Sequence, residues 1–321
     1  MNKVNWDKML ARLIYFVMVR AIGLIEKWRS SMEKVLEIKN LTKYYGKNLG
    51  VEDINLSLGK GEVFGFIGPN GAGKSTTIRC IMNLINKTSG IIYYNGKEND
   101  PNDVEMKKSI GYLPGEVFLY DDLTVKQMLD YHEKFYSEDI HERRAELVEK
   151  LKLDESKKIE DLSLGNKKKV GIVLALAHNP NLIILDEPTS GLDPIMQQVF
   201  YDLIEEEKQK GKTIIYSTHI LNEVSKICDR VGIIKAGHLL KIDTVDNLVN
   251  KSFNVVTVTS GECNKIKNEL ELEIISEEKN TVKFKTELPA DSLIKGLAHY
   301  QIDKILIEEP TIEDLFMHYY E

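Results

Sequence analysis

Short apolar segments alternate with longer polar segments of helix length over residues 32–248, and this alternation predicts an α/β domain. Glu62–Ile67, Leu182–Leu185 and Thr213–Tyr216 are short apolar runs, which are typical of buried strands. Val35–Ile38 and Ile54–Leu58 alternate apolar and polar residues, which also predicts strands. We therefore expect a mainly parallel sheet that is covered on both faces.

Helix patterns dominate residues 115–180, between the first strands and Leu182–Leu185. Thr124 followed by Gln127 predicts a capping box at the start of one helix. We interpret this block as a helical subdomain inserted into the α/β core. The run Lys167–Lys169 is interpreted as a solvated helix face without a function.

From about residue 249 the pattern changes to β-α-β-β-α-β-α. The predicted segments are Val255–Thr259, Asn264–Leu270, Glu273–Ser276, Thr281–Thr286, Ala290–Ala298, Lys304–Glu308 and Ile312–Tyr320. This order predicts a small ferredoxin-like α+β domain over residues 249–321. No group of convergent polar residues is visible there, so we interpret it as a packing or regulatory domain.

Residues 1–31 form a separate segment before Met32, where the sequence looks like a natural domain start. Two arginines interrupt its apolar residues, which makes a membrane-spanning helix costly. Our first interpretation is an extension from an upstream start, without a role in the folded protein. The alternative is a helix on a membrane or partner surface, because four basic residues share one side: Lys8, Arg12, Arg20 and Lys27.

Charge and cysteine content exclude several classes of protein. The chain has 321 residues and a net charge of −7, so no global basic field attracts nucleic acid, and we expect no nucleic-acid partner. Three cysteines without CxxC or Cys/His spacing argue against a disulfide framework or a zinc site. We expect a protein of the reducing cytoplasm.

The sequence GPNGAGKST matches the phosphate-loop pattern G-x-x-x-x-G-K-[ST] and lies between a predicted strand and a predicted helix. Glycines let backbone N–H groups approach phosphate oxygens, Lys74 neutralises their charge, and the Ser75 hydroxyl suits Mg²⁺. The expected nucleotide-binding residues are Gly68, Pro69, Asn70, Gly71, Ala72, Gly73, Lys74, Ser75 and Thr76.

A second motif, LIILDEP, ends the predicted strand Leu182–Leu185 with two acidic residues. A carboxylate at the carboxyl end of a buried strand lies beside a phosphate loop, so Asp186 is expected to hold Mg²⁺ through water. Glu187 is expected to polarise the water that attacks the γ-phosphate. No Asn-Lys-x-Asp motif for guanine occurs, which favours ATP as the nucleotide.

The segment LSLGN, Leu162–Asn166, decides the class. Here the chain resembles the ATP-binding cassette (ABC) family, whose signature is usually LSGGQ, and the resemblance extends over about residues 36–240. SGLDP at Ser190–Pro194 matches the family's D-loop, His219 matches its switch histidine, and Tyr45 matches the aromatic residue that stacks on adenine.

The resemblance implies a head-to-tail dimer with a second ATPase subunit, identical or different. Ser163, Gly165 and Asn166 of one copy would close over the ATP that the other copy binds. His219 would bind the γ-phosphate and help to fix the geometry of Glu187.

Two departures from the family pattern bear on the mechanism. Relatives usually carry glutamine where this chain has Gly115, and that glutamine meets the metal or water and senses the membrane partner. We expect Glu116 or water to substitute, or neighbouring backbone to carry the coupling. In the signature, Leu164 replaces glycine and Asn166 replaces glutamine, which affects how tightly the dimer closes.

The resemblance implies the ATPase subunit of a membrane transporter, bound to separately encoded transmembrane permease subunits at the cytoplasmic face of the membrane. A single cassette, the C-terminal α+β domain and the closing segment Glu308–Tyr320 resemble bacterial ABC-2-type exporter ATPases for drugs, antibiotics and lipids. Two alternatives stay open: a soluble ABC ATPase that acts on ribosomes or DNA, and an ATP-binding regulator that does not hydrolyse.

Overall fold

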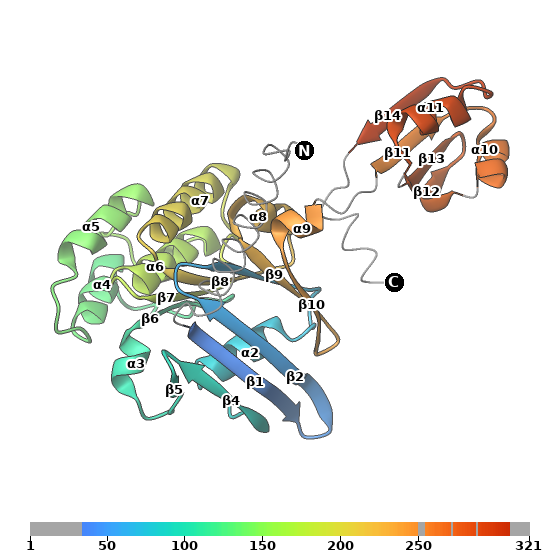
Figure 1. The fold of residues 1–321 in the computed structure, drawn as a ribbon. Helices are drawn as coiled ribbons and strands as arrows, with labels where there is room; N and C mark the ends of the chain where they lie inside the picture. Colours follow the sequence, from blue (N-terminus) through green and yellow to red (C-terminus); the bar gives the residue numbers. More distant parts are fainter. Residues whose placement is uncertain (1–33, 250–253, 271, 287, 309–321) are drawn as a thin grey trace, which may run out of the picture. The chain divides into compact units, whose positions relative to one another are not determined.

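The computed structural model describes residues 34–249, 254–270, 272–286 and 288–308 (Figure 1). The predicted N-terminal extension and the predicted helix Ile312–Tyr320 lie outside these residues. No helix in the described ranges is both long and apolar enough to span a bilayer. The elements, in chain order, are β1 (Lys34–Tyr45), β2 (Asn48–Gly59), β3 (Val63–Ile67), α2 (Lys74–Ile81), β4 (Ser89–Tyr94), β5 (Lys97–Glu98), α3 (Val104–Lys108), β6 (Ile110–Leu113), α4 (Val125–Glu133), α5 (His141–Lys150), the 3-10 helix η1 (Ile159–Asp161), α6 (Leu164–Leu176), β7 (Leu182–Asp186), α7 (Pro194–Gln209), β8 (Thr213–Thr218), α8 (Leu221–Ile227), β9 (Arg230–Lys235), β10 (His238–Thr244), α9 (Val245–Val249), β11 (Asn254–Thr259), α10 (Cys263–Leu270), β12 (Glu273–Glu278), β13 (Thr281–Thr286), α11 (Ala290–Leu297) and β14 (Lys304–Glu308).

The chain divides into two compact units. Of the described residues, 34–63 and 75–215 form the first unit, and 64–74 and 216–308, with the gaps given above, form the second. The domain boundaries predicted from the sequence, after residues 31 and 248, rest on changes in the sequence pattern and not on contacts within the fold. They stay a prediction.

The first two strands belong to a four-stranded antiparallel sheet with the order β2-β1-β4-β5. Only Gly46 and Lys47 separate β1 from β2, and so short a connection permits only antiparallel pairing. Gly46 has a φ of +62°, which glycine adopts without strain. The two alternating segments predicted as strands therefore form a sheet of their own.

The predicted parallel core is a six-stranded sheet with the order β10-β9-β3-β8-β7-β6. β3 pairs with β9 in parallel, β6 pairs with β7 in parallel, and β10 is an antiparallel edge strand. Every residue of β3, β7 and β8 is buried. Continuous burial is typical of strands that are covered on both faces, as predicted from the apolar runs.

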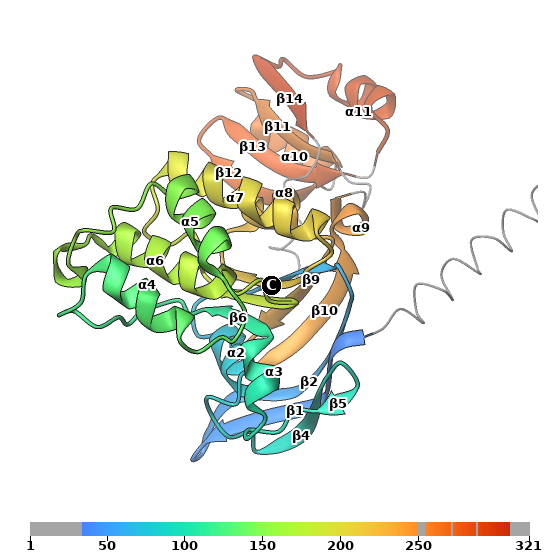
Figure 2. The same cartoon turned by 90° about the vertical axis from the view of Figure 1, so that its left-hand side faces the viewer.

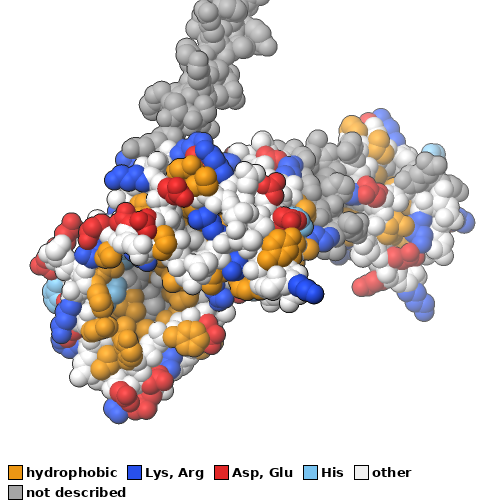
Figure 3. Space-filling view, turned by 90° about the horizontal axis from the view of Figure 1, so that it is seen from below, with side chains coloured by type: hydrophobic (Ala, Val, Ile, Leu, Met, Phe, Trp, Pro, Cys, Tyr) orange, Lys and Arg blue, Asp and Glu red, His pale blue; other side chains and the backbone are white. Residues whose placement is uncertain are grey.

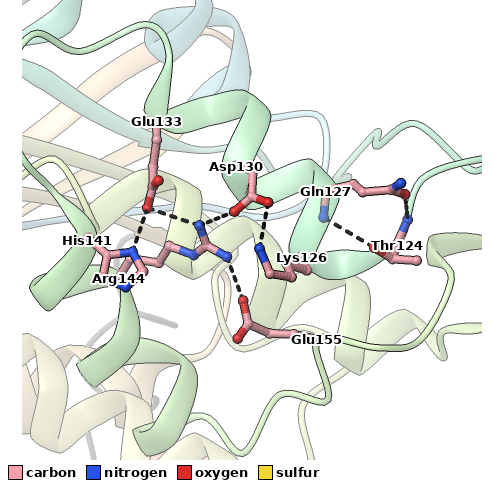
Figure 4. Close-up of polar contacts among 8 residues, drawn as sticks. All are labelled: Thr124, Lys126, Gln127, Asp130, Glu133, His141, Arg144 and Glu155. Atoms are coloured by element: carbon pink, nitrogen blue, oxygen red, sulfur yellow. Dashed lines mark hydrogen bonds and ion pairs between the residues drawn. The ribbon is translucent and has the colours of Figure 1, made fainter.

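Three helices of residues 115–180, α4, α5 and α6, lie side by side in the first unit (Figures 1 and 2). The predicted capping box begins α4: the Gln127 backbone N–H donates to Thr124 Oγ1 at 3.2 Å, and the Thr124 N–H donates to Gln127 Oε1 at 2.8 Å (Figure 4). Such a cap stabilises a helix by about 1 kcal/mol.

A buried arginine joins these helices. The guanidinium of Arg144, on α5, donates to Asp130 and Glu133 of α4 at 2.6 and 3.0 Å, and to Glu155 at 2.6 Å (Figure 4). Burial alone would lower the pKa of Arg144, but these hydrogen bonds outweigh it and raise the pKa. The cation therefore stays charged and fixes α5 against α4.

The C-terminal elements of the second unit have their own sheet, with the order β12-β13-β11-β14 and antiparallel neighbours. Their order, β-α-β-β-α-β, is the predicted one over residues 254–308. Their core consists of Val256, Val258, Cys263, Ile266, Val282, Phe284, Leu293 and Leu297. The ferredoxin-like class of this domain stays a prediction.

Candidate functional site

The phosphate-loop segment follows β3 and leads into α2. Gly71 and Gly73 have φ values of +79° and +114°, which only glycine adopts readily. A Cβ at Gly68 would lie 2.3 Å from the backbone oxygen of Ile234, which no side chain permits. Because glycine is required at all three positions, the backbone can curl and direct its N–H groups toward an anion.

Lys74 lies within this loop and is only 4% exposed. Its ammonium donates to the backbone oxygens of Gly68 at 2.7 Å and Pro69 at 3.1 Å. The positive charge is thereby held over the loop, while Pro69, Asn70 and Gly71 are exposed to solvent. Such a loop can receive phosphate oxygens from outside.

Tyr45 and Tyr44 have different surroundings within the first unit. Tyr44 donates its hydroxyl to Glu52 at 2.8 Å and is half-buried. Tyr45 is 44% exposed, and its hydroxyl lies 3.5 Å from the hydroxyl of Thr76, just after the phosphate loop. Of the two rings, Tyr45 is the one that is free to stack on a base.

The acidic pair lies at the carboxyl end of β7, with Asp186 as the last residue of the strand and Glu187 directly after it. Asp186 is 3% exposed and ends the strand. Glu187 has a φ of +47° and precedes Pro188, although a residue before proline favours extended backbone. Such a conformation costs on the order of 1–3 kcal/mol for a residue other than glycine.

The signature segment forms the start of α6. Ser163 is the N-cap residue, and its hydroxyl accepts from the backbone N–H of Asn166 at 3.3 Å. A Cβ at Gly165 would lie 2.5 Å from the backbone oxygen of Gly191. Gly165 is therefore required for the close approach of the segment Ser190–Pro194. The chain keeps this glycine of the signature, whereas Leu164 stands where the usual signature has its first glycine.

His219 follows β8 in the second unit and is exposed. The buried hydroxyl of Thr218 donates to Glu223 at 2.6 Å and accepts from the backbone N–H of Ile220 at 2.9 Å. These two bonds hold the backbone on both sides of His219, so its imidazole is presented to solvent from a fixed loop.

Comparison with known proteins identifies the family. Residues 51–190 match the ABC transporter family. The linearmycin resistance ATP-binding protein LnrL of Bacillus subtilis is 35% identical to this chain over 305 residues, which cover 88% of this chain and 97% of LnrL. The chain belongs to the ATP-binding cassette family. The bacitracin transport ATP-binding protein BcrA of Bacillus licheniformis is 33% identical over 309 residues, which cover 89% of this cassette protein and 97% of BcrA.

Solved cassette structures agree with the fold. The structure of an ATP-binding subunit of an ABC transporter has a TM-score of 0.63 and 34% identity, over 67% of this chain and 91% of that one. A dimeric cassette in a post-hydrolysis state with ADP and Pi has a TM-score of 0.60 and 28% identity, over 65% and 98%. This cassette protein binds ATP and hydrolyses it to power transport.

Two residues of the cassette were missed from the sequence. Glu223, which fixes the loop around His219, is 3% exposed and also accepts the hydroxyl of Tyr216 at 3.1 Å. In the sequence, Glu223 belongs to no motif and is one of many acidic residues near the start of a helix, so nothing there indicated its role.

Lys168 is the second, and it corrects a prediction. The run Lys167–Lys169 was interpreted as a solvated helix face, but Lys168 is 2% exposed. The interpretation fails because Lys168 lies on the face of α6 that packs against the end of β7 and the loop after β6. Glu116, expected to substitute for the missing glutamine, is exposed and makes no hydrogen bond or ion pair with described residues.

Proposed function

We propose that this protein is the ATPase subunit of an exporter whose cargo is a drug, an antibiotic or a lipid-like molecule. The observation that carries the ATPase part of this proposal is the acidic pair Asp186–Glu187, with Glu187 held in a left-handed conformation directly after a buried strand. The relatives LnrL and BcrA are named for linearmycin resistance and bacitracin transport, and this supports a drug or an antibiotic as the exported cargo.

The phosphate loop is proposed to bind the triphosphate. Backbone N–H groups over Gly68–Thr76 face the phosphate oxygens, and Lys74 neutralises the β- and γ-phosphates. The ring of Tyr45 stacks on adenine from the side of Thr76. His219 donates to the γ-phosphate from its fixed loop.

The oxygen donors of Ser75 and Asp186 fit a magnesium ion, which prefers hydroxyl, carboxylate and water ligands. Asp186 is buried, as a carboxylate is when it serves a cation rather than solvent. When bound, the ion neutralises charge on the β- and γ-phosphates. Glu187 accepts a hydrogen bond from the attacking water and orients it toward the γ-phosphate.

A second cassette is proposed to complete each site. Ser163, Gly165 and Asn166 lie at the start of α6, where backbone N–H groups and the helix dipole favour an anion. In a head-to-tail dimer these residues close over the γ-phosphate of the facing copy. The dimeric state of a related cassette supports this arrangement.

The transmembrane partner is proposed to dock on an aromatic patch formed by Phe118, Tyr120, Tyr131 and Phe135. Their side chains are 82%, 59%, 41% and 53% exposed, and Tyr131 packs edge-on against both Tyr120 and Phe135. Figure 3 shows hydrophobic side chains grouped on one face of the molecule, bordered by charged ones. An exposed apolar group of this kind favours a protein interface, here with a cytoplasmic loop of the permease, which holds the cassette at the membrane.

The docking proposal is tested by co-purification with the multi-span membrane protein that binds this chain. Changing Tyr131→Ser with Phe135→Ser is expected to reduce recovery of that protein at least about tenfold, because hot-spot aromatic residues carry most of the binding energy. Ile294→Ser, at a residue of α11 that is 54% exposed, is the control and is expected to leave recovery unchanged. Equal recovery for both variants would refute the docking surface.

The enzymatic proposal is tested by phosphate release from the purified protein with Mg·ATP. Glu187→Gln is expected to lower kcat by at least about a hundredfold, since the water loses its orienting carboxylate. Glu205→Gln, on the exposed side of α7, is expected to match the wild type. A wild-type protein without turnover would favour the regulator that binds ATP and does not hydrolyse it.

A further inference from the structure

The ammonium of Lys168 is surrounded by backbone carbonyl groups. It donates to Gly115 O at 2.6 Å, to Glu187 O at 3.2 Å and to Pro114 O at 3.3 Å. A lysine ammonium has three protons, and three acceptors satisfy all of them. Lys168 therefore joins three segments of the first unit: α6, the loop after β6 and the end of β7.

The charge of Lys168 also faces the acidic pair. Burial lowers the pKa of Lys168, while the carboxylates of Asp186 and Glu187 raise it. A buried lysine is costly unless its neighbours stabilise it. The three carbonyl acceptors and the two carboxylates offset part of that cost, and the pKa of Lys168 stays below its ordinary value because burial is the larger effect.

Position 115 is where the resemblance expects a glutamine, and Gly115 supplies no side chain. A Cβ built on Gly115 would lie 3.6 Å from Asp186 O and 3.7 Å from Asp186 Oδ2, which are ordinary contact distances. A glutamine would therefore fit beside Asp186 without a clash at its Cβ. Lys168 contacts the same segment through the carbonyl oxygen of Gly115.

We propose that Lys168 is a positioning residue that fixes the backbone of Glu187 against Gly115 and takes the role of the absent glutamine. The inference rests on the proposed function of Glu187 in hydrolysis. Lys168 lies one turn beyond Ser163 and Gly165 in α6, the residues proposed to contact the facing copy's ATP. A shift of α6 on dimer closure is thus passed through the Lys168 ammonium to Glu187 in the same chain.

The test compares ATP turnover in Lys168→Met, which keeps the length of the side chain and removes its donors, with Lys169→Met, its neighbour in the same run. Lys168→Met is expected to lower kcat at least about tenfold with the KM for ATP changed less than about twofold, because the residue orients Glu187 without touching nucleotide. Lys169→Met is expected to keep wild-type values. Equal kcat in the two variants would overturn the proposal.

Restoring the glutamine separates positioning from a purely structural role. Gly115→Gln added to Lys168→Met is expected to recover kcat at least about threefold, whereas a lysine that only stabilised the fold would gain nothing. Failure of this recovery also overturns the proposal. If Lys168→Met does not fold, Lys168→Arg is expected to retain turnover and Lys168→Gln to lose it, and equal values in these two would count against it.

Wild type and Glu187→Gln are measured in the same series. If the wild type hydrolyses ATP and Glu187→Gln does not, the proposed function holds, and the Lys168 variants test only the present inference. If the wild type does not hydrolyse ATP, the proposed function itself fails.

Discussion

Tyr44 and Tyr45 are adjacent in the sequence, but their hydroxyl groups have different partners. The hydroxyl of Tyr44 is committed to Glu52, and the ring of Tyr45 stands beside Thr76 with the Lys43 ammonium 4.9 Å from its centroid. The ring of Tyr45 therefore combines exposure with a position next to the phosphate loop. Of the two side chains, Tyr45 is therefore the one that we propose to stack on adenine.

Replacing Tyr45 with alanine is expected to raise the KM for ATP about tenfold with kcat little changed, because stacking of a base on an aromatic ring contributes about 1–3 kcal/mol. Tyr45→Phe retains the ring and is expected to behave as the wild type. The measurement is steady-state ATP hydrolysis over a range of ATP concentrations. An unchanged KM in Tyr45→Ala would assign the adenine contact to another residue.

The phosphate-loop residues could be predicted from the sequence, because that motif specifies its own backbone geometry. Gly71 and Gly73 have positive φ values, as such a loop requires. Lys168 could not be predicted, because its burial depends on Gly115 and Glu187, which are 53 and 19 residues away. A run of three lysines carries no local sign that the middle one is enclosed.

At the scale of elements, the packing of α4 against α5 depends on polar contacts as well as apolar ones. Arg144 is 4% exposed and binds Asp130, Glu133 and Glu155. The capping box of α4 was predictable from four consecutive residues. The arginine cluster was not, since its three carboxylates come from two separate segments.

Arg144→Met is expected to lower the free energy of unfolding by about 2–3 kcal/mol, because it removes the buried cation that three carboxylates share. The full cost of a buried pair is not expected, since these carboxylates are partly exposed. The control is Lys126→Ala, which removes an exposed i,i+4 pair with Asp130 and is expected to cost about 0.5 kcal/mol or less. Urea unfolding measures both, and equal losses would refute the role of Arg144.

Lowering the pH is expected to weaken the contact between His132 of α4 and His178, which lies just after α6. Burial lowers the pKa of His132 and of His178 from 6.5 to about 4, and the ring of Tyr136 lies against both. The unfolded chain takes up these protons near pH 6.5, whereas the folded chain takes them up only near pH 4. Stability is thus complete above about pH 6.5 and falls as the pH drops toward 4.

Between pH 7.5 and 5.5 each of these histidines is expected to reduce the free energy of unfolding by about 1 kcal/mol. His132→Phe keeps an aromatic ring and is expected to remove its share of that loss. His141→Asn changes an exposed histidine of α5 and is expected to leave the loss as in the wild type. If His132→Phe loses as much free energy of unfolding between pH 7.5 and 5.5 as the wild type, the proposed contribution of His132 is wrong.

At the scale of the whole molecule, the chain combines a cassette with a C-terminal domain that has its own sheet and core. The helix and strand order of the C-terminal domain over residues 254–308 could be predicted, because local periodicity determines it. In the cassette, β4, β5, β9 and β10 were not among the predicted strands. The separate antiparallel sheet β2-β1-β4-β5 was not anticipated, since strand partners depend on connections that periodicity does not describe. The proposed cargo rests on relatives, because the phosphate loop and the acidic pair are common to cassettes whatever they transport.

The central claim is that the carboxylate of Glu187 is required for hydrolysis of the bound ATP. Its most direct test is the identity of the nucleotide that stays bound to the purified protein after incubation with Mg·ATP, as separated by chromatography. The account predicts ADP on the wild type and intact ATP on Glu187→Gln. Conversion of ATP to ADP on Glu187→Gln at the wild-type rate would contradict it.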